Sequence, residues 1–429
     1  MLAKWRVFQI LYRLTLPGGL LVVISAMLIR VGVLADPDLP LVRVVPLVIF
    51  AVGLGVCAFF RRSRLFFAML ALTLAHVVLA WVAPYLSANA SRVVVNAIAI
   101  LLPLNLLVVA FLDERGIISP TGRKRLAVLA VQIIAVCVLS TPWLASPAVM
   151  PSKYLDKSFA PDVFSAWSLI PQPALLVFVL ATAIMMVPLF KSYRAVESSL
   201  LWALLSSFIA FRIGATNHLA GTFFATGALA LIVALIETSY RMAYHDELTQ
   251  LPSRRALNEA LMKLPDAYTV AMLDVDHFKK FNDSYGHESG DQALRLVASR
   301  LAHIAGGGRA YRYGGEEFAV IFPGKLSDEV FIYLDRMRKI IEQSKFIVRG
   351  KDRRRKHGIG RGAKKQTSVT VSIGVASCNG DKVPPADILR MADQALYKAK
   401  ERGRNCTVTA KSGKSVVAVE RGMRILSVS

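Results

Sequence analysis

The chain has 429 residues, of which 55% are hydrophobic, and it carries a formal net charge of +23. This composition, with a mean hydropathy of +0.49, excludes an ordinary soluble globular protein, and the length indicates more than one structural unit. The charge alone would suit a nucleic-acid-binding protein. Much of it, however, lies in short loops between apolar blocks, where it reports membrane topology, so we expect no nucleic acid as a partner.

Residues 1–237 consist of long apolar blocks separated by short polar loops. Each block is nearly long enough to cross the hydrocarbon core of a bilayer as a helix, which predicts an all-α transmembrane bundle. The eight predicted helices cover residues 14–34, 41–60, 65–85, 93–112, 126–145, 168–190, 199–216 and 219–236. Arg212 and His218 lie at the connection between the last two, and a single re-entrant pair is the alternative there.

Positive charges in this region gather in alternate loops, at residues 4–13, 61–64, 115–125 and 191–194. Loops rich in Lys and Arg stay on the cytoplasmic side of a membrane. We therefore expect a multi-pass protein of the cytoplasmic membrane with both termini in the cytoplasm. The first apolar run is interpreted as an anchor, since no small-residue cleavage pattern closes it.

Polar side chains inside the apolar blocks are few. His76, Asn96, Asn105 and Gln132 are expected to be interhelical hydrogen-bond partners rather than ligands of a sensed molecule.

From about Ala243 the pattern changes to short strands alternating with helices. TVAMLDVDHF, the two halves of RYGGEEFAVIF, and SVTVSIGVAS have the composition of strands. DQALRLVASRLAHIA, DEVFIYLDRMRKIIEQS and PADILRMADQALYKAKERG have helical periodicity, and the last stops at Gly403. This order predicts an α/β sandwich with an antiparallel hairpin in its sheet.

Carboxylates cluster at one predicted edge of that sheet. Asp274 and Asp276 end the first strand and, by the alternation of a strand, point to one face. A turn at Gly314–Gly315, with the positive φ that glycine tolerates, is expected to bring Glu316 and Glu317 close to them.

Three or four carboxylates at one edge repel each other and need cations. Hard oxygen ligands suit Mg²⁺ or Mn²⁺, which bind through one or two carboxylates plus substrate phosphates. The chemistry indicated is phosphoryl or nucleotidyl transfer. A surface hairpin with solvated acids is the alternative for the Glu-Glu pair taken alone.

Five blocks in order, HDELTQLPSRRAL, LDVDHFKKFNDSYGHESGDQAL, GGEEF, VTVSIGVA and ALYKAKERGRN, resemble the signature of the GGDEF-domain diguanylate cyclases over residues 243–408. The resemblance implies an α+β sandwich of the nucleotide-cyclase and polymerase-palm type. It also implies synthesis of cyclic di-GMP from two GTP, with release of two pyrophosphates, by a homodimer in which each domain holds one nucleotide. The location expected for such a protein is the bacterial inner membrane.

The resemblance also assigns roles to individual residues. Asp274 and Glu316 are expected to hold the metal with the backbone carbonyl of Val275, and Glu317 to be the base or a second metal ligand for the attack of the 3′-hydroxyl. The remaining matches are Asn282 and Asp291 at the guanine positions, and Lys279, Lys400 and Arg404 at the phosphate positions.

Three departures from the family pattern stand out. The product-inhibition motif, Arg-x-x-Asp, is replaced by Ala305 and Gly308 at its ends, so we expect no product-inhibition site. The stretch 349–365 is a long basic insertion, interpreted as a solvated loop; contact with anionic lipid is the sharper alternative. Ser253 replaces a frequent asparagine.

The remaining segments complete the predicted organisation, with a connector helix at 238–247 and a C-terminal tail at 409–429. We expect the membrane region to control how two catalytic domains meet. One alternative is a degenerate cyclase domain that only binds GTP or tethers partner enzymes. A transporter with a regulatory tail is another, although no inverted repeat is evident.

Overall fold

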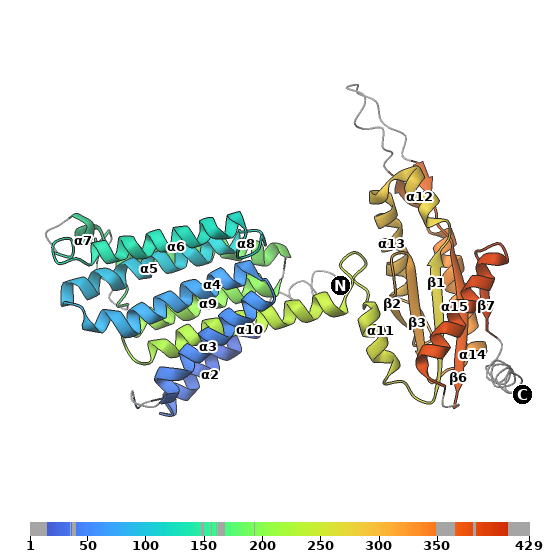
Figure 1. The fold of residues 1–429 in the computed structure, drawn as a ribbon, viewed down its shortest axis with the longest axis horizontal. Helices are drawn as coiled ribbons and strands as arrows, with labels where there is room; N and C mark the ends of the chain where they lie inside the picture. The colour runs from blue at the N-terminus through green and yellow to red at the C-terminus, as the bar shows by residue number, and fades with distance from the viewer. Residues whose placement is uncertain are drawn as a thin grey trace, which may run out of the picture. The chain divides into compact units, whose positions relative to one another are not determined.

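The computed structural model describes residues 15–34, 36, 40–146, 150–155, 157–159, 161, 168–192, 194–348, 365–380 and 383–410. The chain divides into two compact units, Met1–Ser239 and Tyr240–Ser429 (Figure 1). The described part of the first unit is helical, and the second unit is built around a β-sheet. The division falls inside one helix, α10 (Ala220–Tyr244), whose last residues belong to the second unit.

Every apolar block predicted in the first unit overlaps a helix. The helices are α2 (Gly18–Arg30), α3 (Pro40–Phe59), α4 (Ser63–Val77), α5 (Ala88–Ala110), α6 (Pro120–Leu139), α7 (Met150–Leu155), α8 (Gln172–Ser192), α9 (Ala195–Arg212) and α10. A π-helical turn, η1 (Val78–Val82), and a 3₁₀ turn, η2 (Ala83–Tyr85), extend α4.

Six helices among the described residues are long and apolar enough to cross a membrane, compared with the eight predicted. They lie at Val42–Phe59, Ser63–Tyr85, Ala88–Ala110, Gln172–Lys191, Ala195–Arg212 and Ala220–Tyr244. Of the other two, α2 has 13 residues, which at helical rise span only about 20 Å. The other, α6, carries three basic residues, Arg123, Lys124 and Arg125, near its start.

Small residues let the last two helices of this unit pack closely. A Cβ added at Gly227 of α10 would lie 2.6 Å from the Ser206 hydroxyl of α9 and 3.1 Å from the Cα of Ala203. Close backbone approach of this kind is how helices associate in an apolar environment, where burial of apolar side chains gives little advantage. This explains why α9, the least apolar of the six spans, is largely buried in the bundle.

The predicted polar partners behave in two ways. Asn105 of α5 and Gln132 of α6 exchange hydrogen bonds of 2.8 and 3.1 Å, which confirms the prediction for this pair. The His76 ring instead packs between Phe50 and Phe224, with ring centroids 5.4 and 6.2 Å away. Its Nε2 atom has no hydrogen-bond partner among the described residues, so the prediction fails for this atom.

The second unit contains a five-stranded sheet of order β2-β3-β1-β6-β7. Its strands are β1 (Ala267–Val275), β2 (Arg309–Arg312), β3 (Glu317–Pro323), β6 (Val371–Asn379) and β7 (Thr407–Thr409). β1 pairs antiparallel with both β3 and β6, and β7 runs parallel to β6. A separate ribbon joins β4 (Phe346–Val348) to β5 (Lys365–Thr367).

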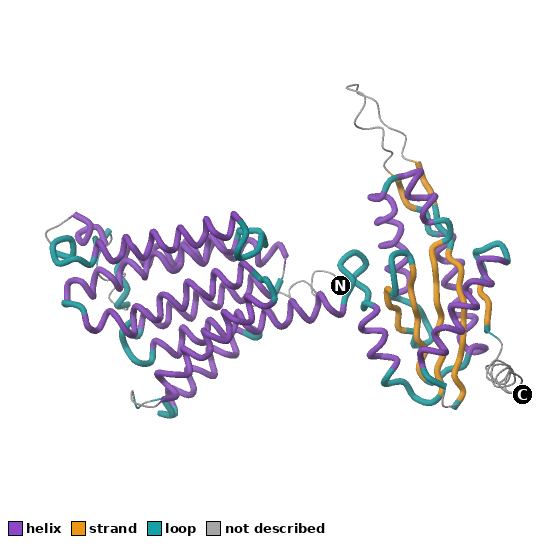
Figure 2. The backbone as a smooth tube through the Cα atoms, viewed as in Figure 1, coloured by secondary structure: helices purple, strands orange, loops and turns teal. Residues whose placement is uncertain are grey.

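Helices cover both faces of the sheet, as Figure 2 shows. The helices of this unit are α11 (Arg254–Leu261), α12 (Phe278–Tyr285), α13 (His287–Leu301), α14 (Ser327–Gln343) and α15 (Pro385–Glu401). β1 alternates between two cores: Leu273 and Val275 pack with α13 and α14, whereas Val270 and Met272 pack with α11 and α15. The predicted α/β sandwich with an antiparallel β2–β3 hairpin is therefore confirmed.

Candidate active site

The end of β1 brings a buried carboxylate to the edge of the sheet. In the antiparallel register Asp274 lies opposite Glu317 of β3, so the two side chains share one face. Asp274 is only 5% exposed, and its Oδ2 lies 2.9 Å from the Lys400 Nζ of α15. Burial raises the pKa of Asp274 above its usual value, and the hydrogen bond and charge of Lys400 offset only part of this rise.

The hairpin turn docks against the same strand end. The backbone N–H groups of Tyr313 and Gly314 donate to the carbonyl of Glu317 at 2.9 and 3.2 Å, and Val275 donates to the carbonyl of Glu316 at 3.2 Å. Burial, and then the charge of Asp274, raise the pKa of Glu316. The turn therefore holds the two glutamates beside the buried carboxylate.

The two glycines of the turn were predicted to be needed for a positive φ, and this prediction is wrong. Neither Gly314 nor Gly315 adopts a positive φ. A Cβ added at Gly314 would lie 2.7 Å from the Glu317 Oε2, whereas one at Gly315 would meet nothing within 4 Å. Gly314 thus leaves room for the Glu317 carboxylate, and the space in front of Gly315 is open.

Asp274, Val275, Glu316 and Glu317, the predicted metal-binding residues, meet at this edge. Among the described residues no three His, Cys, Asp or Glu side chains form a ready-made metal site. The donor set still fits Mg²⁺ or Mn²⁺, because such ions need only one or two carboxylates and complete their shells with water and substrate phosphates. Burial is the largest cause of the raised pKa of Asp274 and of Glu316, so their charged forms are disfavoured in the protein alone, and a bound cation would stabilise them.

Asp276 does not join this group as predicted. Its carboxylate accepts hydrogen bonds from the Thr370 hydroxyl at 2.7 Å, the Ser372 hydroxyl at 2.6 Å and the Asn405 backbone N–H at 3.1 Å. Both of its oxygens are therefore engaged by the protein. The fourth carboxylate serves a different purpose from the other three.

The predicted guanine-binding residues lie at the corner between α12 and α13. The Asn282 Oδ1 is buried without a hydrogen-bond partner among the described residues. A Cβ added at Gly290 of α13 would lie 1.8 Å from this oxygen, so only glycine allows the approach. Asp291 follows Gly290 directly, which places the amide and the carboxylate at one corner. An unsatisfied buried acceptor there suits a ligand that donates hydrogen bonds.

The three predicted phosphate contacts are placed differently. Lys400 is held by Asp274, while Arg404 is exposed just after α15 and helps to lower the pKa of Asp274 against the larger effect of burial. Lys279 is exposed on α12. The structure thus brings Lys400 and Arg404 to the carboxylates and leaves Lys279 on the neighbouring helix.

A fourth cation, missed by sequence reasoning, clamps the hairpin. The Arg312 guanidinium donates to the carbonyls of Gly314 and Gly315 at 3.1 and 2.7 Å and pairs with Asp246 at 2.6 Å. Asp246 also accepts from the backbone N–H and hydroxyl of Thr249 at 2.8 and 2.7 Å. Asp246 lies in the first signature block, whereas Arg312 stands two residues before the GGEEF block.

Ser253 and Gly308, two of the departures from the family pattern, lie among the described residues. Ser253, at the position of the frequent asparagine, donates its hydroxyl to the Ala243 carbonyl at 2.9 Å and its N–H to the Tyr244 carbonyl at 2.8 Å, so it binds the end of α10. A Cβ added at Gly308 would lie 2.7 Å from the Phe322 ring, which leaves no room for an aspartate without a shift. The basic stretch 349–365, except for the backbone of Lys365 in β5, and the tail from 411 lie outside the described residues.

Comparison with known proteins gives a consistent picture. Residues 243–406 match the family model described as diguanylate cyclase, GGDEF domain. The chain is 35% identical over 181 residues to the response regulator PleD of Caulobacter vibrioides, covering 40% of this chain and 37% of that protein. It is 35% identical over 199 residues to the probable diguanylate cyclase DgcF of Escherichia coli K12, covering 44% and 59%.

Other similar proteins cover the same region. The diguanylate cyclase VdcA of Vibrio cholerae is 40% identical over 168 residues, covering 38% of this chain and 46% of that protein. The crystal structure of the coiled coil and GGDEF domain of DgcB from Caulobacter crescentus with c-di-GMP is 32% identical, with a TM-score of 0.36, covering 41% of this chain and 90% of that one. The chain spans between 37% and 59% of the length of these three curated relatives.

Proposed function

Residues 243–406 of this chain belong to the diguanylate cyclase GGDEF family, and from this premise we propose that the protein condenses two GTP into cyclic di-GMP and releases two pyrophosphates. The observation that carries the proposal is the meeting of Asp274, Glu316 and Glu317 at the end of β1, beside Lys400. Carboxylates and cations in one place serve both a metal and a triphosphate.

Each group has a task in the proposed reaction. Asp274, Glu316 and the carbonyl of Val275 would hold Mg²⁺ or Mn²⁺, with Glu317 as an alternative further ligand, and the bound ion supplies positive charge to the phosphate oxygens. Glu317 accepts the proton of the 3′-hydroxyl as this oxygen bonds to the α-phosphorus of the other GTP. The bond from that phosphorus to the bridging oxygen of the β-phosphate breaks, and pyrophosphate leaves.

The other residues bind the nucleotide. Lys279, Lys400 and Arg404 neutralise the triphosphate, and arginine can contact two phosphate oxygens at once. Asn282 and Asp291 accept hydrogen bonds from the N1 and N2 donors of guanine, which adenine cannot provide in the same pattern.

The product requires two linkages, so two domains must face each other. Each domain contributes one GTP and one set of the groups above, and the active form is a homodimer. The first unit, with its six apolar helices, would anchor the protein in the bacterial inner membrane and leave the catalytic domain in the cytoplasm, where GTP is available. The connector at 238–247, which includes the end of α10, would carry changes in the membrane region to the dimer geometry.

The direct test is product formation by the full chain in lipid nanodiscs. GTP and Mg²⁺ are added, and cyclic di-GMP and pyrophosphate are measured against Glu317→Gln, with Asp328→Asn, an exposed carboxylate of α14, as matched control. We expect one cyclic di-GMP per two pyrophosphates, lost only in Glu317→Gln. GTP binding without any product would overturn the proposal in favour of a GTP receptor or scaffold.

A further inference from the structure

The turn after α15 holds an unusual backbone conformation next to the site. Gly403, Arg404 and Asn405 have φ values of 99°, 68° and 46° in succession. Left-handed backbone is unfavourable for a residue with a side chain, although asparagine tolerates it better than most. Such a conformation persists only where surrounding contacts impose it.

Asp276 supplies one of these contacts, alongside the hydrogen bond from the Arg404 N–H to the Ala399 carbonyl at 3.1 Å. This carboxylate, 7% exposed, accepts the backbone N–H of Asn405 at 3.1 Å and is itself held by the hydroxyls of Thr370 and Ser372. Its own N–H donates to the carbonyl of Thr370 at 2.9 Å. Asp276 therefore ties the end of β1 and the start of β6 to the turn that follows α15.

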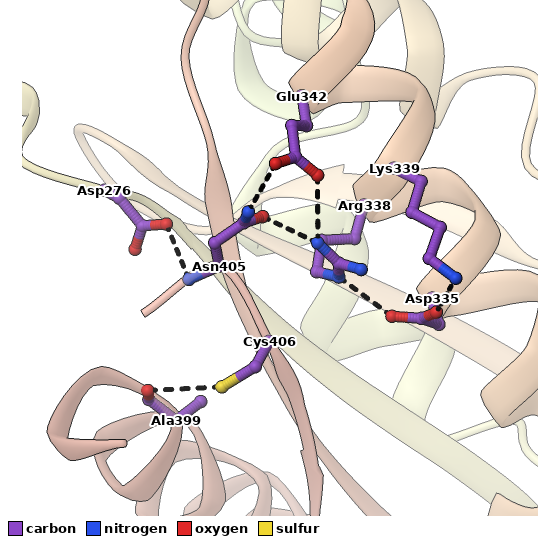
Figure 3. A network of polar contacts seen from close by, with 8 residues as sticks. All are labelled: Asp276, Asp335, Arg338, Lys339, Glu342, Ala399, Asn405 and Cys406. Carbon is purple, nitrogen blue, oxygen red and sulfur yellow. Dashed lines mark hydrogen bonds and ion pairs between the residues drawn. The ribbon is translucent and has the colours of Figure 1, made fainter. Parts of the chain in front are cut away.

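The Asn405 side chain fastens the same turn to α14, as Figure 3 shows. Its Nδ2 donates to Glu342 at 2.8 Å, and its Oδ1 accepts from Arg338 at 2.8 Å. Arg338 is in turn paired with Glu342 at 3.2 Å and with Asp335 at 2.8 Å. The turn is thus held at two points: Asp276 binds the backbone N–H of Asn405, and residues of α14 bind the Asn405 side chain.

We propose that Asp276 is a positioning residue that, together with Asn405, holds Arg404 in place for the triphosphate of GTP and is not a ligand of the metal. The inference rests on the proposed function. Its geometric basis has two parts. Both Asp276 oxygens already accept hydrogen bonds from the protein, and one of them binds the backbone N–H of Asn405, the residue directly after Arg404. The role separates the two aspartates of the DVD sequence: Asp274 faces the reaction, and Asp276 shapes the neighbouring turn.

The two roles predict different responses to a neutral, isosteric side chain. Asp276→Asn retains one acceptor oxygen for Asn405 and Thr370, and the Ser372 hydroxyl can rotate to accept from the new amide. A positioning residue therefore tolerates this change within about fivefold in kcat/KM, well below the loss that a bidentate phosphate contact represents. A metal ligand would not, because the charge is lost, and the Mg²⁺ concentration for half-maximal rate would rise.

The test uses the full chain in nanodiscs and compares Asp276→Ala, Asp276→Asn, Thr370→Val, Arg404→Ala and the double variant Asp276→Ala/Arg404→Ala. Asp276→Ala should raise the KM for GTP about 10- to 100-fold, the loss expected for a charged hydrogen bond to phosphate, with a smaller change in kcat. In the Arg404→Ala background the same substitution should have almost no further effect, because coupled residues are not additive. If Asp276→Ala does not fold, Thr370→Val replaces it in the comparison. This variant keeps the Asp276 charge and removes one of its hydrogen bonds, so the KM for GTP should rise by less than is expected for Asp276→Ala.

The outcomes separate this proposal from the proposed function. Additive effects of the two alanine substitutions, or an Asp276→Asn variant as impaired as Asp276→Ala with an increased Mg²⁺ requirement, would overturn the positioning role. A wild-type protein that forms no cyclic di-GMP would instead overturn the proposed function. The same set of variants is then compared by equilibrium GTP binding, where a coupling between Asp276 and Arg404 supports the positioning role and its absence refutes it.

Discussion

Replacing Arg312 tests whether the β2–β3 hairpin is held through its backbone. The guanidinium joins Asp246 to the carbonyls of Gly314 and Gly315, and the two charged side chains are only 14% and 24% exposed. Breaking a fully buried ion pair costs about 3–5 kcal/mol. Because this pair is partly exposed, we expect Arg312→Ala to lower the free energy of unfolding by about 2–4 kcal/mol.

Arg312→Lys separates charge from geometry. An ammonium group can reach Asp246 or one carbonyl but cannot match the planar fork of arginine, so we expect roughly half of that loss. In both variants the hairpin tip moves relative to β1. A displacement of about 1 Å in a catalytic group costs up to about 100-fold in rate, so kcat should fall by about 10- to 100-fold.

The pH dependence of the free energy of unfolding gives a second test of the Arg312–Asp246 ion pair. Burial alone would raise the pKa of Asp246, but hydrogen bonds from Thr249 and Arg312 outweigh it and hold this pKa below its ordinary value of 3.8. A carboxyl whose pKa is depressed by folding stabilises the folded state above its unfolded pKa and loses that contribution as the pH falls through the folded value. The stability difference between the wild type and Arg312→Ala should therefore be full at pH 7 and shrink below about pH 4.

The assay is urea unfolding of residues 238–429 followed by circular dichroism. This fragment carries the two cores of the second unit, one on each face of the sheet. Arg336→Ala, at an exposed arginine of α14, is the matched control. An Arg312→Ala midpoint equal to that of the control, together with a kcat within about twofold of the wild type, would refute the clamp.

Three further predictions concern the site itself. Glu316→Gln should stabilise the metal-free domain at neutral pH, because burial and neighbouring carboxylates raise the pKa of Glu316. This gain in stability should disappear below pH 4.5, the ordinary pKa of the group, because Glu316 of the wild type is then protonated in both the folded and the unfolded state. Thermal unfolding measured against pH checks this. Gly314→Ala should leave the unfolding midpoint nearly unchanged yet lower kcat about tenfold or more, because the new Cβ displaces only the Glu317 carboxylate; equal loss of stability and activity would contradict this. Asn282→Ala should lower kcat/KM for GTP about tenfold and that for inosine triphosphate less, since the latter lacks the 2-amino donor; identical losses would argue against a contact to that group.

The outlines of the second unit could be predicted because its signals are local. β1 is apolar on both faces, as expected for a strand covered on both sides, and the Gly-Gly pair marks the hairpin that the structure contains. The resemblance carried the candidate residues further than periodicity could, since it assigned Asn282 and Asp291 before anything placed them at one corner. The helical blocks were visible for the same reason, and only the basic start of α6 and the short α2 depart from a membrane-crossing length or composition.

The failures concern side-chain directions. Alternation along a strand placed Asp276 with Asp274, but alternation ends with β1 at Val275, and from there the carboxylate is claimed by hydroxyls and an N–H. The glycines of the turn were expected to need positive φ, whereas Gly314 is needed for the volume that Glu317 occupies. Neither result follows from the spacing of residues.

The sequence by itself determined a chain of two parts, an apolar helical region and an α/β domain with carboxylates at the end of its first strand, because hydropathy and periodicity depend on near neighbours. Only the tertiary structure decided which carboxylates meet at the end of β1 and which bind other parts of the fold. Asp276 meets Thr370 and Asn405 across 94 and 129 positions, and Arg312 meets Asp246 across 66. Contacts over such separations form only when the sheet has assembled, and they leave no local pattern in the chain.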